Sequence, residues 1–139
     1  KVVPAVKALI ERDGKLLVLK TEASGKVYYV LPGGKIKYGE SSEEALKREI
    51  KEEISCSIEI GDPVGNYHFF TGPKGNGKQV VLTVFRGSIG EQEIDITDNR
   101  AEEGIIEYLW MRPEELIEKS SNDSLKNLIR DLRGQNKQD

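Results

Sequence analysis

The sequence contains very few residues that form disulfides or cysteine-based metal centres, and it has no long apolar run. Its 139 residues include one cysteine, Cys56. A single cysteine excludes an internal disulfide framework and a zinc site built on cysteines, so we expect a reducing, cytoplasmic location. No apolar stretch approaches the ~20 residues of a membrane span, so we expect no membrane association. Strand-like sequence starts directly at Lys1, and we therefore expect no signal peptide.

The chain also lacks an excess of positive charge. It has 21 Lys and Arg against 24 Asp and Glu, for a net charge of −3. This balance argues against electrostatic binding of a nucleic acid polymer or of an anionic membrane. The apolar content suits a globular fold, and the length suits a single domain. We expect that domain over residues 1–133, followed by a polar tail over 134–139.

The residues that are present alternate between strand-like and helix-like segments. Runs of β-branched and aromatic residues predict strands, and Asp13-Gly14 predicts a hairpin turn between the first two. The expected strands are residues 2–10, 15–20, 27–31, 58–60, 64–71, 79–89 and 105–111, and the expected helices are 41–54, 113–119 and 124–132. This order favours an α/β sandwich with helices on both faces of a mixed sheet.

The first expected helix is the most strongly marked and the most acidic. Ser41 and Glu44 have the spacing of a capping box, which fixes the start of the helix. Glu49, Glu52 and Glu53 have the spacing i, i+3, i+4 and therefore share one stripe. On a helical wheel Glu53 lies closest to the apolar face.

Such a stripe is locally unfavourable because like charges repel, most of all where water is scarce. One interpretation is a solvated acidic face, and the other is a bound hard cation such as Mg²⁺, which takes oxygen ligands. The preceding Pro32-Gly33-Gly34 predicts a tight turn that brings backbone carbonyls close to the carboxylates. A carbonyl oxygen is a further suitable ligand, so this loop favours the cation.

At this point the residues resemble a known family. The sequence from Gly34 reads GKIKYGESSEEALKREIKEEISC, which is similar to the signature box of the Nudix hydrolases. The matching positions are Gly34, Glu40, Arg48, Glu49, Ile50, Glu52 and Glu53. Ser55 stands where the family has a glycine that ends the helix in a left-handed conformation, and Cys56 stands at the final apolar position. These two departures concern the end of the helix and leave the acidic positions intact.

The resemblance implies a Nudix-type α/β/α sandwich with a central mixed sheet, and a single Nudix hydrolase domain over residues 1–133. It implies hydrolysis of the pyrophosphate linkage of a nucleoside diphosphate derivative, with Mg²⁺ or Mn²⁺ as cofactor. The run PGGKIKYGES is most similar to members of the MutT type, which act on nucleoside triphosphates. ADP-ribose or a nucleotide sugar is an alternative substrate, and a non-catalytic nucleotide-sensing module is an alternative function. Many members are dimers, so the resemblance also favours a homodimer.

The resemblance further implies roles for individual residues. The implied metal ligands are the carbonyl of Gly33 and the carboxylates of Glu49, Glu52 and Glu53. Arg48 would orient Glu49, which binds metal or acts as general base, and Lys35 and Glu40 would contact the substrate. Members of the family often recruit one more acid from a later loop, for which Glu102 and Glu103 are candidates. An exposed acidic loop explains these two residues equally well.

Overall fold

Seven strands and three helices make up the part of the chain that the computed structural model describes, residues 1–73, 76–98 and 104–138. The strands are β1 (Val2–Arg12), β2 (Lys15–Ala23), β3 (Lys26–Val30), β4 (Gly33–Lys35), β5 (Glu59–Thr71), β6 (Lys78–Ser88) and β7 (Ile105–Met111). The helices are α1 (Ser42–Ile54), α2 (Pro113–Lys119) and α3 (Asp123–Gln138).

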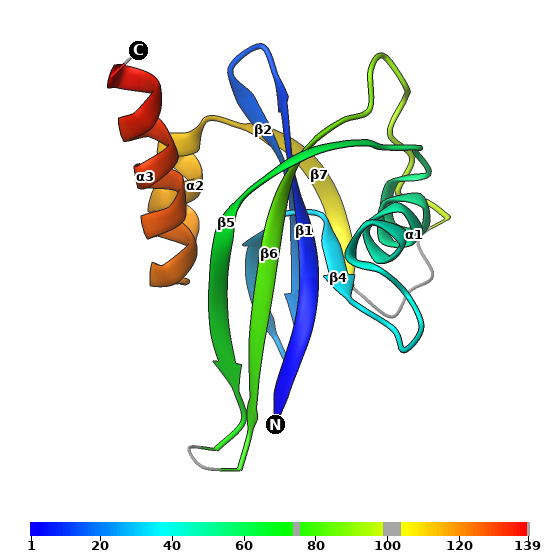
Figure 1. Cartoon of the computed structure of the whole chain (residues 1–139), viewed down its shortest axis with the longest axis vertical. Helices are drawn as coiled ribbons and strands as arrows, with labels where there is room; N and C mark the ends of the chain where they lie inside the picture. The colour runs from blue at the N-terminus through cyan, green and yellow to red at the C-terminus, as the bar shows by residue number, and fades with distance from the viewer. Residues whose placement is uncertain (74–75, 99–103, 139) are drawn as a thin grey trace.

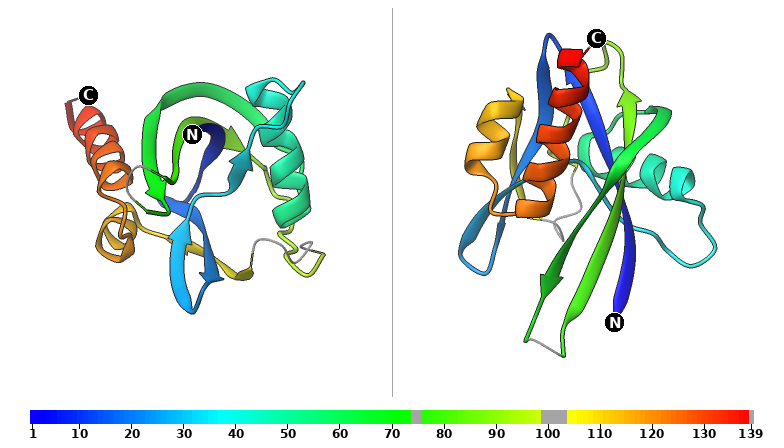
Figure 2. Two further views of the ribbon diagram at one scale, coloured as in Figure 1. Left: turned by 90° about the horizontal axis from the view of Figure 1, so that it is seen from below. Right: turned by 60° about the vertical axis from the view of Figure 1, so that its left-hand side comes forward.

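The strands form a mixed sheet in the order β3-β2-β1-β6-β5, with β4 added to β1 and β7 added to β2. β1 and β6 run parallel, and the other pairs are antiparallel. α1 lies on one side of the sheet, and α2 and α3 lie together on the other (Figure 1). The left panel of Figure 2, seen from below, shows the same three layers. The expected α/β/α sandwich is therefore confirmed.

β1 separates two apolar cores because its side chains alternate between the faces of the sheet. Val6, Ala8 and Ile10 pack with the buried face of α1. Ala5 and Leu9 pack with the residues of α2 and α3 on the opposite side. α1 is thus held against the sheet by its own apolar stripe, and this fixes where its polar stripe lies.

Both ends of α1 are defined by local chemistry. At the start, the Ser41 side chain accepts from the Glu44 N–H, and the Glu44 carboxylate accepts from the Ser41 N–H, which completes the predicted capping box. At the end, Ser55 adopts the left-handed conformation, with φ 59° and ψ 34°, and donates its N–H to the Lys51 carbonyl. The helix therefore ends as a glycine would end it, in a conformation that is less favourable for serine.

Three predicted boundaries differ from the structure. Gly33-Gly34 was expected in a tight turn, but both residues belong to β4, which pairs with β1. The two extended stretches predicted after α1 are one strand, β5, with irregular pairing between Ile60 and Gly65. α3 continues to Gln138, so the segment expected as a tail from residue 134 is still helical. None of the helices in the described ranges is long and apolar enough to cross a membrane.

Candidate active site

The candidate site lies where α1 faces the edge strand β4. Lys7 and Gly33 are partners in the antiparallel pairing of β1 with β4. Backbone hydrogen bonds join Ala8 to Pro32 on one side of this pair and Pro4 to Ile36 on the other. Gly33 therefore occupies a position without ladder hydrogen bonds, and both its N–H and its C=O point away from β1.

These two outward groups of Gly33 have oppositely charged partners. The N–H donates to Oε1 of Glu53 over 2.7 Å. The carbonyl oxygen accepts from Nζ of Lys7 over 3.1 Å. One peptide segment of β4 thus links a carboxylate of α1 to an ammonium group of β1.

Neither glycine of this strand has free space for a Cβ. Gly33 has a φ of 134°, and a Cβ there would overlap the carbonyl oxygen of Val6. At Gly34 the obstacle is a side chain, because a Cβ would lie 2.7 Å from both the carboxylate carbon and Oε1 of Glu49. The bare backbone of β4 therefore lets the carboxylates of α1 come against the strand.

The three glutamates of the acidic stripe differ in exposure. Glu49 is 6% exposed and Glu53 is 3% exposed. The Glu52 side chain is 39% exposed. This order agrees with the helical wheel, which placed Glu53 nearest the apolar face. Two carboxylates are thus largely withdrawn from water, which is costly unless the surroundings provide hydrogen bonds or positive charge.

Arg48 supplies positive charge to this cluster and joins four of its groups. Its Nε and Nη2 donate to the two carboxylate oxygens of Glu40 over 2.6 and 2.9 Å. Nη1 lies 3.0 Å from Glu49 and 3.5 Å from Glu52. Nη2 also donates to the backbone carbonyl of Lys35 over 3.1 Å. The guanidinium therefore fixes the loop before α1 to the acidic stripe.

The Arg48–Glu40 pair changes the ionisation of both groups. Hydrogen bonds from Arg48 and from the Lys37 N–H lower the pKa of Glu40 to about 2. The same pairing raises the pKa of Arg48 above its already high value. Both groups are therefore charged throughout the neutral range, and the pair is a permanent brace rather than a proton donor or acceptor.

The oxygen-rich donor set of this cluster suits a hard divalent cation. Across residues 1–73, 76–98 and 104–138, no three His, Cys, Asp or Glu side chains are already gathered into a metal centre. The chemistry of the donors nevertheless fits Mg²⁺ or Mn²⁺, because they are all oxygens. The carboxylate of Glu49 also lies directly against the backbone of Gly34, in the space that a side chain at this position would fill.

The structure brings most of the predicted site residues together. Glu49, Glu53 and Gly33 are in one cluster, and Arg48 ties Glu40 and Glu52 to it. The carbonyl of Gly33, which was expected to be a metal ligand, accepts from Lys7 instead, and its N–H is the group that meets Glu53. Lys35 contributes its carbonyl to Arg48, while its side chain is exposed. Glu102 and Glu103 lie outside the described residues. Lys7 was not among the predicted site residues, although a single lysine within the apolar run VVPAVKALI is a visible signal.

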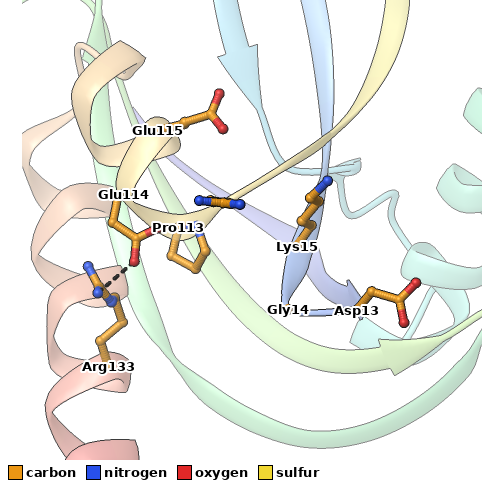
Figure 3. Close-up of a pocket in the computed structure, with 8 residues that line it drawn as sticks. Asp13, Gly14, Lys15, Pro113, Glu114, Glu115 and Arg133 are labelled. Carbon is orange, nitrogen blue, oxygen red and sulfur yellow. Dashed lines mark ion pairs between the residues drawn. The ribbon is translucent and has the colours of Figure 1, made fainter.

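A separate cleft lies at the turn between β1 and β2, against the start of α2 (Figure 3). Its lining carries charges of both signs, and Arg133 pairs with Glu114 over 2.6 Å. None of the residues of the acidic cluster lines it. The acidic cluster of α1 therefore lies outside this cleft.

Comparisons with known proteins show the family of the chain. The ADP-ribose pyrophosphatase of Methanocaldococcus jannaschii is 41% identical over 64 residues, which cover 45% of this chain and only 38% of that protein. The nucleoside triphosphatase NudI of Escherichia coli is 28% identical over 133 residues, which cover 88% of this chain and 90% of that protein. The MutT protein of Methanosarcina mazei Go1 has a similar structure, with a TM-score of 0.80, 25% identity and coverage of 98% and 96% of the two chains. The model of the NUDIX domain matches residues 1–132, and the chain therefore belongs to the NUDIX family.

Proposed function

We propose that this protein hydrolyses the pyrophosphate linkage of a nucleoside diphosphate derivative, with Mg²⁺ or Mn²⁺ as cofactor. Nucleoside triphosphates are the preferred substrates. The observation that carries the proposal is the arrangement at β4, where two buried carboxylates of α1, Glu49 and Glu53, meet a strand edge made of two glycines. A purely structural acidic helix would have no reason to bury these charges.

Each residue of the cluster has a separable task in such a reaction. Glu52 and Glu53 would hold the cation, which when bound offsets the negative charge of the pyrophosphate and activates water. Glu49 would either join these ligands or accept the proton of the attacking water. Arg48 keeps Glu49 oriented and prevents the loop that carries Glu40 from moving away. The N–H of Gly33 fixes Oε1 of Glu53 and so holds this carboxylate against β4.

The choice of nucleoside triphosphates rests on two similarities. The run PGGKIKYGES is similar to members of the MutT type, and NudI, a nucleoside triphosphatase, matches nearly the whole chain. ADP-ribose is the second candidate, because the archaeal ADP-ribose pyrophosphatase has the higher identity over its shorter match. Nucleotide sugars contain the same linkage and are included in the test.

The proposal is tested by incubating the purified protein with Mg²⁺ and a panel of substrates. The panel contains the ribo- and deoxyribonucleoside triphosphates, ADP-ribose, nucleotide sugars and dinucleoside polyphosphates. Released phosphate and pyrophosphate are measured, and we expect turnover of at least one triphosphate that stops with EDTA and returns with excess Mg²⁺. A higher kcat/KM for ADP-ribose would move the assignment to the second candidate.

A non-catalytic module would give a different pattern. It would bind a nucleotide in calorimetry and release no product from any substrate of the panel, with either metal. That result would overturn hydrolysis and leave nucleotide sensing as the function. The cluster itself favours catalysis, because a module that only binds has no need of three metal-binding carboxylates beside Arg48.

A further inference from the structure

Lys7 is the one charged residue within the apolar part of β1, Val2 to Ile10. Its neighbours Val6 and Ala8 are fully buried, and Ala5 and Leu9 are nearly so. Lys7 itself is half-buried, and it pairs with Gly33 on one side and with Val84 on the other. A lysine in such a place loses part of its hydration, which must be compensated by nearby groups.

The side chain of Lys7 leaves β1 on the same face as Ala5 and Leu9, opposite α1, and its Nζ reaches the edge strand β4. Lys7 and Gly33 face each other at a position without ladder hydrogen bonds, where side chains come closest to the partner strand. Nζ reaches the carbonyl of Gly33, whose N–H is bound by Glu53. The ammonium group is therefore separated from a buried carboxylate of the site by one residue of β4.

The ammonium group of Lys7 also has capacity for another ligand. It has three N–H donors, and a single contact, with the neutral carbonyl of Gly33, is found for it within the described residues. By contrast, the guanidinium of Arg48 is already engaged with Glu40, Glu49 and Glu52.

We propose that Lys7 binds the substrate, by donating from Nζ to a phosphate oxygen at the edge of β4. This inference rests on the proposed function, since it names the group that the substrate presents there. An anion is the natural partner of a half-buried ammonium that has only a carbonyl, and lysine binds phosphate well as a point charge. The contact also brings the pyrophosphate next to Gly33 and therefore next to Glu53.

The test uses a ligand that cannot be hydrolysed. Binding of methylenediphosphonate with Mg²⁺ is measured by calorimetry for the wild type, Lys7→Met and Lys7→Arg. Methionine keeps the length of the side chain without its charge, so we expect a loss of affinity of about 10- to 100-fold, the range for a hydrogen bond to a charged group. Arginine keeps the charge and should recover most of the affinity. In the substrate panel Lys7→Met should raise KM more than it lowers kcat.

Two controls separate substrate binding from other roles of Lys7. Lys47→Met changes the net charge equally at an exposed position of α1 and should leave the affinity within about twofold of the wild type. Mn²⁺ binding without phosphonate, followed by electron paramagnetic resonance, should be unchanged in Lys7→Met. Unchanged phosphonate affinity in Lys7→Met, or an equal loss of Mn²⁺ binding, would overturn the proposal for Lys7. The binding measurements with phosphonate and Mn²⁺ need no turnover. A failure of the proposed hydrolysis would therefore appear only in the substrate panel, and a failure of the proposal for Lys7 only in the binding measurements.

Discussion

The carboxylate of Glu49 lies directly against the backbone of Gly34, so that a single added methyl group would come within 2.7 Å of it. The contact joins the second residue of an edge strand to a helix residue 15 positions later in the sequence. The first glycine of the proposed catalytic motif therefore has a steric role toward one of its glutamates. This explains in physical terms why the two positions belong to one pattern.

Gly34→Ala should lower turnover much more than it lowers stability. The new methyl group displaces the end of the Glu49 side chain, and a misplacement of about 1 Å in a catalytic group can cost about 100-fold in rate. Gly34 does not need a positive φ, so the backbone is not strained. We expect a loss of about 1 kcal/mol or less in the free energy of unfolding, measured in urea.

Gly14→Ala is the matched control for this variant. Gly14 has a φ of 77° in the β1–β2 turn, and a Cβ there would contact nothing within 4 Å. Alanine in that conformation costs about 1 kcal/mol of stability, but turnover should stay at the wild-type level. If Gly34→Ala and Gly14→Ala have the same turnover, the contact of Gly34 with Glu49 has no catalytic importance.

The Arg48–Glu40 pair predicts a specific dependence of stability on pH. The pKa of Glu40 is about 2 in the folded protein, against an ordinary value of 4.5. A lowered pKa in the folded state stabilises the protein above the unfolded-state pKa, and this contribution is lost as the pH falls from about 4.5 toward about 2. The melting temperature of the wild type should therefore exceed that of Glu40→Gln at pH 7, and the difference should shrink over that window.

Comparing the two proteins at each pH removes the contribution of the other acids, which both proteins share. If the difference in melting temperature is constant from pH 7 to pH 2, the ionised Glu40 side chain does not stabilise the folded protein through Arg48. The same variant should lower turnover by about 10- to 100-fold, because groups that orient a ligand of a metal site typically matter to this extent.

Ser55→Gly should make the protein more stable. Ser55 ends α1 with a φ of 59°, a conformation that glycine adopts without the steric cost that a Cβ imposes. We expect a gain of about 0.5 to 1 kcal/mol in urea unfolding. Ser55→Ala keeps a Cβ and should show no gain. A Ser55→Gly protein that is no more stable than Ser55→Ala would mean that the helix end is not strained.

The parts of the fold that depend on local chemistry were predictable from the sequence. The capping box of Ser41 and Glu44 and the apolar periodicity of α1 determine the helix, and the wheel then gives the order in which Glu49, Glu52 and Glu53 are buried. β4 was not predictable in this way. Its pairing with β1 is made with residues far away in the sequence, and its glycines are equally typical of a turn.

In the candidate site, too, the residue types were predictable from the sequence and the contacts between distant residues were not. The resemblance to the Nudix box identified Gly34, Glu40 and Arg48. It could not reveal that Arg48 donates two hydrogen bonds, from Nε and Nη2, to the carboxylate of Glu40. Lys7 was overlooked because its significance comes from a contact across 26 positions. The extension of α3 beyond residue 134 was missed because the last residues are polar and continue no apolar stripe.

Glu53→Gln provides the sharpest test of the acidic cluster, because the change preserves shape and removes charge. Oε1 of Glu53 accepts from the N–H of Gly33, and the amide oxygen of glutamine can accept the same hydrogen bond. The variant should therefore fold normally, with a circular dichroism spectrum and melting temperature close to those of the wild type. Without the negative charge, turnover should fall by a factor of at least ~100.

Glu43→Gln makes the same chemical change at an exposed position in the first turn of α1, away from the cluster, and should retain wild-type turnover. Calorimetric Mn²⁺ binding should distinguish the two variants as well, because Glu53 is expected to hold the cation and Glu43 is not. Near-normal turnover in Glu53→Gln would remove Glu53 from the mechanism, and with it the reason for burying a carboxylate against Gly33. A loss of turnover with unchanged Mn²⁺ binding would instead assign Glu53 to the substrate or to the attacking water.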